Sequence, residues 1–159
     1  MATIDNFVRI EPGNSRDLDS VMAVMETAFG NRFGEAWTRS QLSGILPMAG
    51  VALTLARDPD TREPVGFSLC RTVADESELL LIAVRPERHG SGIGRRLLEN
   101  FFDAARSDGV ARVHLEVRDG NPAIAMYRAA GFSPVGRRRN YYLGADGQRF
   151  DAITLAHHL

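Results

Sequence analysis

Residues 78–98 read ELLLIAVRPERHGSGIGRRLL, an apolar run followed by a glycine-rich segment and the start of a helix pattern. Its first seven residues form a nearly continuous apolar run, which predicts a central β-strand covered on both faces. Gly90, Gly92 and Gly94 follow, directly before a helix predicted over residues 92–107. Glycines allow a turn that brings several backbone N–H groups onto one anion, and the helix adds the positive end of its dipole. The stretch therefore predicts a phosphate or pyrophosphate site, although a strand-to-helix turn packed with small residues would also explain it.

Better-known phosphate-binding motifs do not fit this loop. All 19 residues in the Lys+Arg total are arginine, and the chain contains no lysine. A P-loop, a protein kinase and a pyridoxal-phosphate enzyme each depend on a lysine, so these classes are excluded. The dinucleotide-binding fingerprint requires Gly-x-Gly-x-x-Gly and an acidic residue about 20 residues further on. Here the spacing is Gly-x-Gly-x-Gly and Val110 stands where the acid is needed.

The segments around this stretch alternate between strand and helix patterns. The predicted order is one strand, two helices, three strands, then a helix, a strand, a helix and two strands. No repeat or linker interrupts this order, so residues 1–159 are expected to form a single α/β domain with a mixed sheet. The strands are expected at 7–10, 51–56, 65–73, 78–84, 112–117, 132–139 and 150–156, and the helices at about 15–29, after 37, at 92–107 and at 121–130.

Composition and charge limit the kinds of ligand and partner, and the compartment, that are expected for this chain. Residues 1–80 carry 7 arginines and 12 acidic side chains, whereas residues 81–159 carry 12 arginines and 8 acidic side chains. A phosphate-bearing ligand is therefore expected on the second half, unless the gradient only reflects an unevenly charged surface. Cys70 allows no internal disulfide, and neither a signal peptide nor a membrane-length apolar run is visible, so a cytoplasmic protein is expected. The sequence predicts no metal site, no nucleic-acid partner and no membrane partner.

The glycine stretch and a second block together resemble the GCN5-related N-acetyltransferase (GNAT) superfamily. In that family a strand leads into V-x-P-x-x-(Arg/Gln)-G-x-G-x-(Gly/Ala)-x-x-L-L, which residues 84–98 match except that His89 replaces Arg or Gln. The second block runs from LEVR at residues 115–118, through Asn121 and AIAMY at 123–127, to Gly131. The resemblance implies the GNAT fold, a single mixed, mostly antiparallel twisted sheet of about seven strands flanked by about four helices.

The resemblance also implies acetyl-CoA as the acetyl donor, without a metal. The pantetheine arm would pair with the backbone of the strand that ends at Val84, and Asn121 would hydrogen-bond the arm unless it only caps the next helix. The backbone amides of the loop would hold the pyrophosphate, with Arg88 or Arg95 supplying positive charge in place of the usual side chain at His89. The implied cofactor residues are Ile82, Ala83, Val84, Arg88, His89, Gly90, Ser91, Gly92, Ile93, Gly94, Arg95 and Asn121.

Two residues carry the implied chemistry. Glu116 matches the family's general base, and its outward phase on an apolar strand makes it available to a cleft; a solvated glutamate paired with Arg118 is the alternative. Tyr127 matches the acid that protonates the departing thiolate; a packing tyrosine is the alternative. The segment between the two is one residue shorter than in the family pattern, which leaves the approach of Tyr127 to the sulfur open. His114 shares a strand face with Glu116 and is expected to be a surface histidine; a residue that helps relay a proton is the alternative.

Three further segments resemble a subfamily, the bacterial ribosomal-protein alanine N-acetyltransferases of the RimI type. They are FGEAWTRSQL at residues 33–42, LEVRDGN at 115–121 and RRRNYYLGADGQRFDAITLA at 137–156. This likeness implies acetylation of a protein N-terminus, with a ribosomal protein as the partner. The implied substrate-binding residues are Phe33, Glu35, Tyr141 and Tyr142. A small-molecule amine as the acceptor, or a module that binds acyl-CoA without transferring it, remain alternatives.

Overall fold

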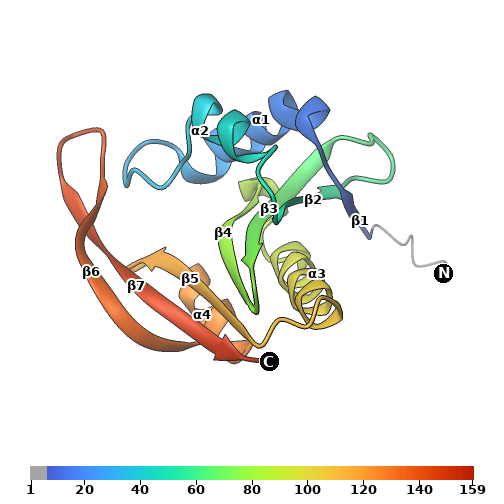
Figure 1. Ribbon diagram of the computed structural model, residues 1–159. Coiled ribbons are helices and arrows are strands. Elements are labelled where there is room, and N and C mark those ends of the chain that lie inside the picture. The colour runs from blue at the N-terminus through green and yellow to red at the C-terminus, as the bar shows by residue number, and fades with distance from the viewer. Residues whose placement is uncertain (1–6) are drawn as a thin grey trace.

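Seven strands form one sheet in the order β1-β2-β3-β4-β5-β7-β6 in the computed structural model, which describes residues 7–159 (Figure 1). Every neighbouring pair is antiparallel except β4 with β5, which is parallel. The predicted mixed sheet and element order are therefore confirmed. The elements are β1 (Arg9–Pro12), α1 (Leu18–Phe29), α2 (Arg39–Ile45), β2 (Val51–Arg57), β3 (Pro64–Val73), β4 (Glu76–Val84), α3 (Ile93–Ser107), β5 (Arg112–Arg118), α4 (Ala123–Ala129), β6 (Ser133–Leu143) and β7 (Arg149–His158), with 3-10 turns at Ser15–Asp17 and Pro86–Arg88.

Helices cover both faces of the sheet. Figure 1 shows α1 and α2 on one face and α3 and α4 on the other. Val21 and Met25 of α1 are fully buried against strand residues such as Phe67, while Leu98 of α3 packs on Leu115 of β5. Each such side chain contributes about 1.5–3 kcal/mol when fully removed from water. The central strand β4 is thus covered on both faces, as its apolar run predicts.

Several element boundaries differ from the prediction by two or more residues, among them those of the first strand, the first helix and β6. The first strand begins at Arg9, and Phe7 is 67% exposed. The first helix begins as a 3-10 turn whose N-cap Asn14 makes a capping box with Asp17. The strand β6 extends to Leu143, four residues beyond its predicted end. Its pairing with β7 shifts register after Arg138 and resumes at Tyr142.

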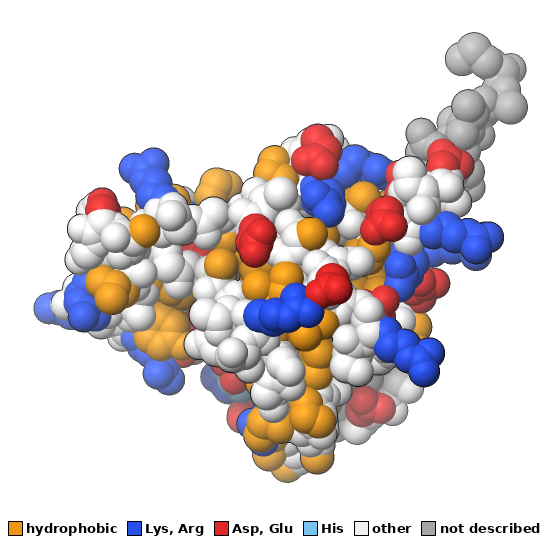
Figure 2. All heavy atoms as spheres, turned by 90° about the horizontal axis from the view of Figure 1, so that it is seen from above, with side chains coloured by type: hydrophobic (Ala, Val, Ile, Leu, Met, Phe, Trp, Pro, Cys, Tyr) orange, Lys and Arg blue, Asp and Glu red, His pale blue; other side chains and the backbone are white. Residues whose placement is uncertain are grey.

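Acidic residues of the first half of the chain meet basic residues of the second half in the folded molecule. Asp58 pairs with Arg88, Glu35 with Arg118, and Glu76 with Arg112. On the face shown in Figure 2, acidic and basic side chains are interspersed. The charge gradient along the sequence is therefore partly cancelled by folding.

The strands β4 and β5 separate after four paired residues. Their parallel pairing runs from Glu76–Arg112 to Leu79–Leu115 and then stops. At the same point the register of β3 against β4 shifts, because β3 residues Leu69 and Cys70 pair with Leu81 and Leu79 and leave Leu80 as an extra residue. Such a β-bulge bends a strand. Beyond it the backbone of β4 and the end of β5 flank an opening at the centre of the sheet.

No helix within residues 7–159 is long and apolar enough to cross a membrane.

Candidate active site

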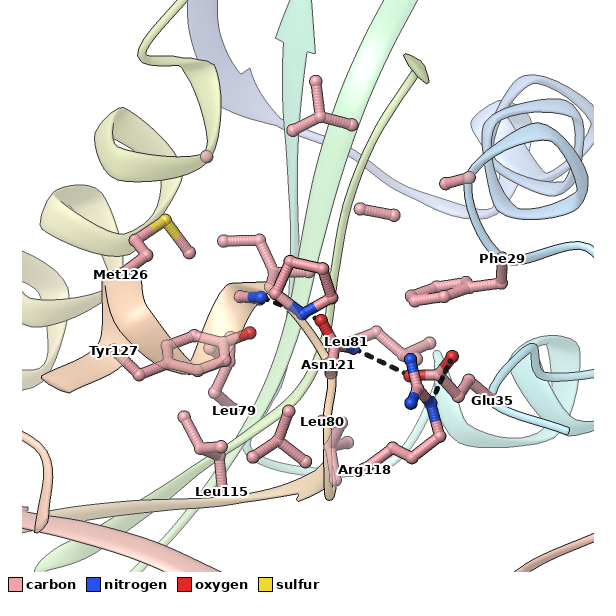
Figure 3. A pocket seen from close by; sticks show the side chains of 18 of the residues that line it. Phe29, Glu35, Leu79, Leu80, Leu81, Leu115, Arg118, Asn121, Met126 and Tyr127 are labelled. Carbon is pink, nitrogen blue, oxygen red and sulfur yellow. Dashed lines mark hydrogen bonds and ion pairs between the residues drawn. The ribbon is translucent and has the colours of Figure 1, made fainter. Parts of the chain in front are cut away.

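A cleft of about 880 Å³ occupies the opening between β4 and β5. Its lining brings together every site residue predicted from the sequence except Ser91, whose hydroxyl donates instead to the carbonyl of Arg88. The cleft also includes Phe29, Trp37 and Met126, which were not predicted. Figure 3 shows it flanked by β4 and β5, with α4 on one side and the segment around Glu35 on the other. Residues 7–159 contain no group of three or more His, Cys, Asp or Glu side chains placed to hold a metal ion.

The glycine loop lies at one end of this cleft. Gly90 and Gly92 have φ angles of 78° and 83°, the left-handed region that glycine adopts without strain. A Cβ atom on either would meet nothing within 4 Å, so these glycines serve the backbone path and not a packing contact. At Gly94 a Cβ would lie 3.3 Å from the sulfur of Met126, so this glycine does allow close packing of α3 on α4. Open backbone at the N-terminus of α3, a 15-residue helix, fits an anionic group.

The charged or ionisable side chains at the loop and the start of α3 differ in whether they already have a partner. Arg88 donates to Asp58 at 2.8 Å, and this bond, with two backbone N–H donors, lowers the pKa of Asp58 to about 2. The His89 ring Nε2 lies 2.8 Å from the carbonyl oxygen of Val84, so the side chain at the position that departs from the family pattern binds back onto β4. Arg95 lines the cleft, is exposed and makes no ion pair within residues 7–159. Of the two arginines predicted to supply positive charge to the phosphates, Arg95 in α3 is therefore the one without an ion pair among the described residues.

Glu116 projects from β5 into the cleft and is held on both carboxylate oxygens. Thr154, its direct partner across the β5–β7 pair, donates its hydroxyl to Oε2 at 2.9 Å. The Nε of Arg138 lies 2.8 Å from Oε1. The Glu116 side chain is 13% exposed and that of Arg138 is 62% exposed. The alternative that Glu116 pairs with Arg118 is wrong, because Arg118 pairs with Glu35.

Tyr127 combines a packed ring with an accessible hydroxyl. Its residue exposure is 5%, and its ring meets Phe132 edge to face at 5.8 Å. Its hydroxyl points into the cleft (Figure 3). Burial raises the pKa of this phenol strongly, with the neighbouring Tyr142 and Glu35 adding to the shift, so the group is protonated at neutral pH. A protonated phenol at this position is able to donate a proton.

Asn121 uses both polar groups of its side chain. Its oxygen accepts from the backbone N–H of Ala123, the first residue of α4, at 2.9 Å, while the N-cap position itself is Pro122. Its nitrogen donates to Glu35 Oε2 at 2.8 Å and keeps a second N–H, because a carboxamide has two. The bond to the start of α4 thus leaves this residue able to donate a hydrogen bond to a ligand.

The two tyrosines of β6 differ in exposure. Tyr142 is partly buried and its hydroxyl lies 3.5 Å from the backbone carbonyl of Glu116, while Tyr141 is 49% exposed and packs edge to face on it at 4.9 Å. Burial raises the pKa of Tyr142 strongly. Both rings line the cleft opposite the glycine loop, together with Phe33 and Glu35.

Sequence reasoning missed the side chains that hold Glu116. Thr154 and Arg138 lie 38 and 22 residues further along the chain, and only the pairing of β7 with both β5 and β6 brings them to the carboxylate. An available signal was the alternation of β7, which places one polar side chain among apolar neighbours at Thr154.

Comparison with known proteins adds the following. Residues 18–132 match the model of the acetyltransferase (GNAT) family. The chain is 39% identical over 132 residues, covering 82% of it and 78% of the relative, to [ribosomal protein bS18]-alanine N-acetyltransferase of Escherichia coli strain K12. It is 52% identical over 81 residues, 49% of each chain, to N-alpha-acetyltransferase RimI of Mycobacterium tuberculosis. The crystal structure of the ribosomal-protein-S18-alanine N-acetyltransferase from Escherichia coli superposes with a TM-score of 0.84 at 31% identity, covering 94% of this chain and 92% of the other.

Proposed function

This chain belongs to the acetyltransferase (GNAT) family and is an N-acetyltransferase, and we propose that it acetylates the N-terminal alanine of ribosomal protein bS18. The observation that carries the proposal is the likeness to bS18-alanine N-acetyltransferases, which extends over 82% of the chain in sequence and 94% in structure. The tail RRRNYYLGADGQRFDAITLA, which the resemblance assigns to the acceptor site, lies in β6 and β7 beside the cleft.

The family uses acetyl-CoA as its acetyl donor, and the cleft fits this compound. The free edge of β4 over residues 82–84 offers backbone groups to an amide-bearing arm, and the loop at Gly90 and Gly92 offers amides to a pyrophosphate. With Arg88 bound to Asp58, Arg95 is the proposed side-chain partner of the phosphates. The backbone of Ala83 faces β3, where it pairs with Phe67, and the Val84 carbonyl lies against the His89 ring. The proposed backbone partners of the arm are therefore the groups of Ile82 and the N–H of Val84, which face the open edge of β4.

Acetyl-CoA brings a thioester, and two proton transfers accompany the transfer of its acetyl group to an amine. A peptide N-terminus has a pKa near 8, so most of it is ammonium at neutral pH and has to lose a proton before its nitrogen can form the new C–N bond. We assign this proton to Glu116, directly or through one water molecule. As the C–S bond breaks, the protonated phenol of Tyr127 supplies a proton to the departing sulfur.

The acceptor is proposed to enter from the end of the cleft opposite the glycine loop. Phe33, Glu35, Tyr141 and Tyr142 line that end, and Glu116 lies beside them on β5. Here the segment between α1 and α2 touches the tip of the β6–β7 hairpin: Ala145 donates its N–H to the carbonyl of Asn31 at 3.1 Å. This contact gives the acceptor end a wall on two sides, which suits the free end of a chain.

The test is the initial rate of CoA release with acetyl-CoA and short peptides. A peptide with the N-terminal sequence of bS18 is expected to be the best acceptor, and peptides of the same sequence starting with serine or methionine to be slower. The same peptide with a blocked N-terminus is the matched control and is expected to be inert. Turnover with polyamines, aminoglycosides or free amino acids alone would replace the peptide with a small-molecule acceptor. Tight binding of acetyl-CoA without turnover of any amine would indicate a binding module.

A further inference from the structure

Within the described part of the chain, Arg118 is the one charged residue that is buried, with 8% exposure. It lies at the end of β5, two residues after Glu116, and neither the proton transfers nor the phosphate contacts use it. A buried guanidinium is costly unless it is paired, so its partners indicate what it does.

Three partners surround Arg118, and two of them lie in one loop. Its Nε is 3.2 Å from Glu35 Oε1, and the two side chains are only 9% and 10% exposed. Its guanidinium carbon lies 3.6 Å from the centre of the Phe33 ring, an arrangement that arginine favours for its planar, delocalised charge. Its Nη1 donates to the carbonyl of Asp119. Figure 3 shows Arg118 and Asn121 converging on the carboxylate of Glu35.

The loop that Arg118 meets depends on contacts of this kind. Residues 30–38, here called the α1–α2 loop, contain no helix or strand, yet Phe33, Glu35 and Trp37 line the cleft. The tip of the β6–β7 hairpin holds the early part of the loop through the Asn31 carbonyl. At Glu35 the loop is held by Arg118 and Asn121.

We propose that Arg118 is a positioning residue that fixes the α1–α2 loop against β5 and the start of α4 by neutralising Glu35. Oε1 of Glu35 lies in the ion pair with Arg118 and Oε2 accepts from Asn121, so we assign this carboxylate to anchoring the loop and not to binding the ammonium of the acceptor. Asn121 also accepts from the backbone N–H of Ala123, the first residue of α4, which is the helix that carries Tyr127, so one network places the acceptor loop relative to that helix. The proposal rests on the proposed function for where the acceptor binds.

The test compares Glu35→Gln, Arg118→Gln and the double variant, which replaces the ion pair with two neutral amides. Each single variant leaves a buried charge unpaired and is expected to raise KM for the peptide about ten-fold or more, with KM for acetyl-CoA nearly unchanged. The double variant is expected to be less impaired than either single variant, because the two residues act as one pair. Arg118→Lys, which keeps the charge but loses the planar fork and the stacking on Phe33, is expected to be intermediate.

Arg112→Gln is the matched control, because Arg112 lies on the same strand in a more exposed pair with Glu76 at 3.2 Å. It is expected to behave like the wild type. Amide hydrogen exchange is expected to rise in residues 30–38 of the single variants and to stay unchanged in α3. Thermal unfolding of each variant is recorded first, and the double variant decides the matter if a single variant does not fold.

Two results would overturn the proposal. One is a double variant whose peptide KM is as high as that of Glu35→Gln, because a glutamate that binds the acceptor directly is not rescued by removing Arg118. The other is exchange in residues 30–38 that no variant changes. If the wild type acetylates no peptide, the proposed function fails, and the exchange measurement alone still decides whether Arg118 holds the loop.

Discussion

Replacing Glu116 with glutamine separates the role of this side chain in the reaction from its role in the fold. The substitution keeps the shape, and the new amide oxygen can still accept the Thr154 hydroxyl, which lies 2.9 Å from Oε2. The new amide nitrogen faces the Nε of Arg138, so two donors oppose each other. Arg138 is 62% exposed and is free to turn into solvent, at the cost of an exposed ion pair of about 0.2–1 kcal/mol.

The expected loss of activity is far larger than this small cost in stability. A positioned general base contributes roughly 10²- to 10⁴-fold to a rate, so kcat/KM is expected to fall by about that factor while the melting temperature changes little. The measurement is CoA release with the bS18 peptide, beside thermal unfolding. Glu78→Gln is the control, because Glu78 also lines the cleft but pairs with His114 at 3.6 Å. A Glu116→Gln enzyme as active as the Glu78→Gln enzyme would refute the assignment of the base.

Three further outcomes are expected. Tyr127→Phe should lower kcat by about 10²-fold or more, and since burial keeps this phenol protonated, the wild-type rate should show no loss from its ionisation up to pH 10, measured as a pH–rate profile. Thr154→Val should lower kcat several-fold by freeing the Glu116 carboxylate, while Thr154→Ser, which keeps the hydroxyl, should restore most of the rate; equal rates for the two variants would exclude this hydrogen bond from the reaction. The pKa of Asp58 is lowered from 3.8 to about 2, so the ionised carboxylate stabilises the fold above pH 4, and this stabilisation is lost as the pH falls toward 2. The difference in unfolding free energy between the wild type and Asp58→Asn, measured by denaturant titration, should therefore shrink over that range.

Patterns among neighbouring residues were enough to predict most of the helices and strands. The alternation in β5, the apolar run of β4 and the capping box at Thr38 are properties of neighbouring residues, and each element formed where its pattern predicts. The opening between β4 and β5 is different, because it depends on the extra residue Leu80 in the pairing with β3. A bulge of this kind leaves the apolar run unchanged, so the sequence pattern does not reveal where the cleft begins.

The candidate site also contains parts that neighbouring residues predict and parts that only the folded chain brings together. The glycine loop was predictable because its chemistry lies in consecutive residues, Gly90 to Gly94. The partners of Glu116 could not be predicted in this way, because Arg138 and Thr154 are distant in sequence and only β6 and β7 bring them to the carboxylate. Arg118, which is near in sequence, is not a partner. The alternative interpretation of Glu116 paired it with Arg118 in solvent, whereas Arg118 is buried because Glu35 and Phe33 reach it from a loop more than 80 residues away.

The most direct test of the account uses intact bS18 with a free N-terminal alanine as the acceptor. The protein is incubated with acetyl-CoA and the enzyme, and mass spectrometry of its peptides locates each added group. Because the enzyme contains no lysine, lysine acetylation detected in the mixture belongs to the acceptor. We expect one acetyl group, on the alanine α-amino nitrogen, formed by the wild type and not by Glu116→Gln. Acetylation of lysine side chains with the alanine left free, or equal product from both enzymes, would contradict it.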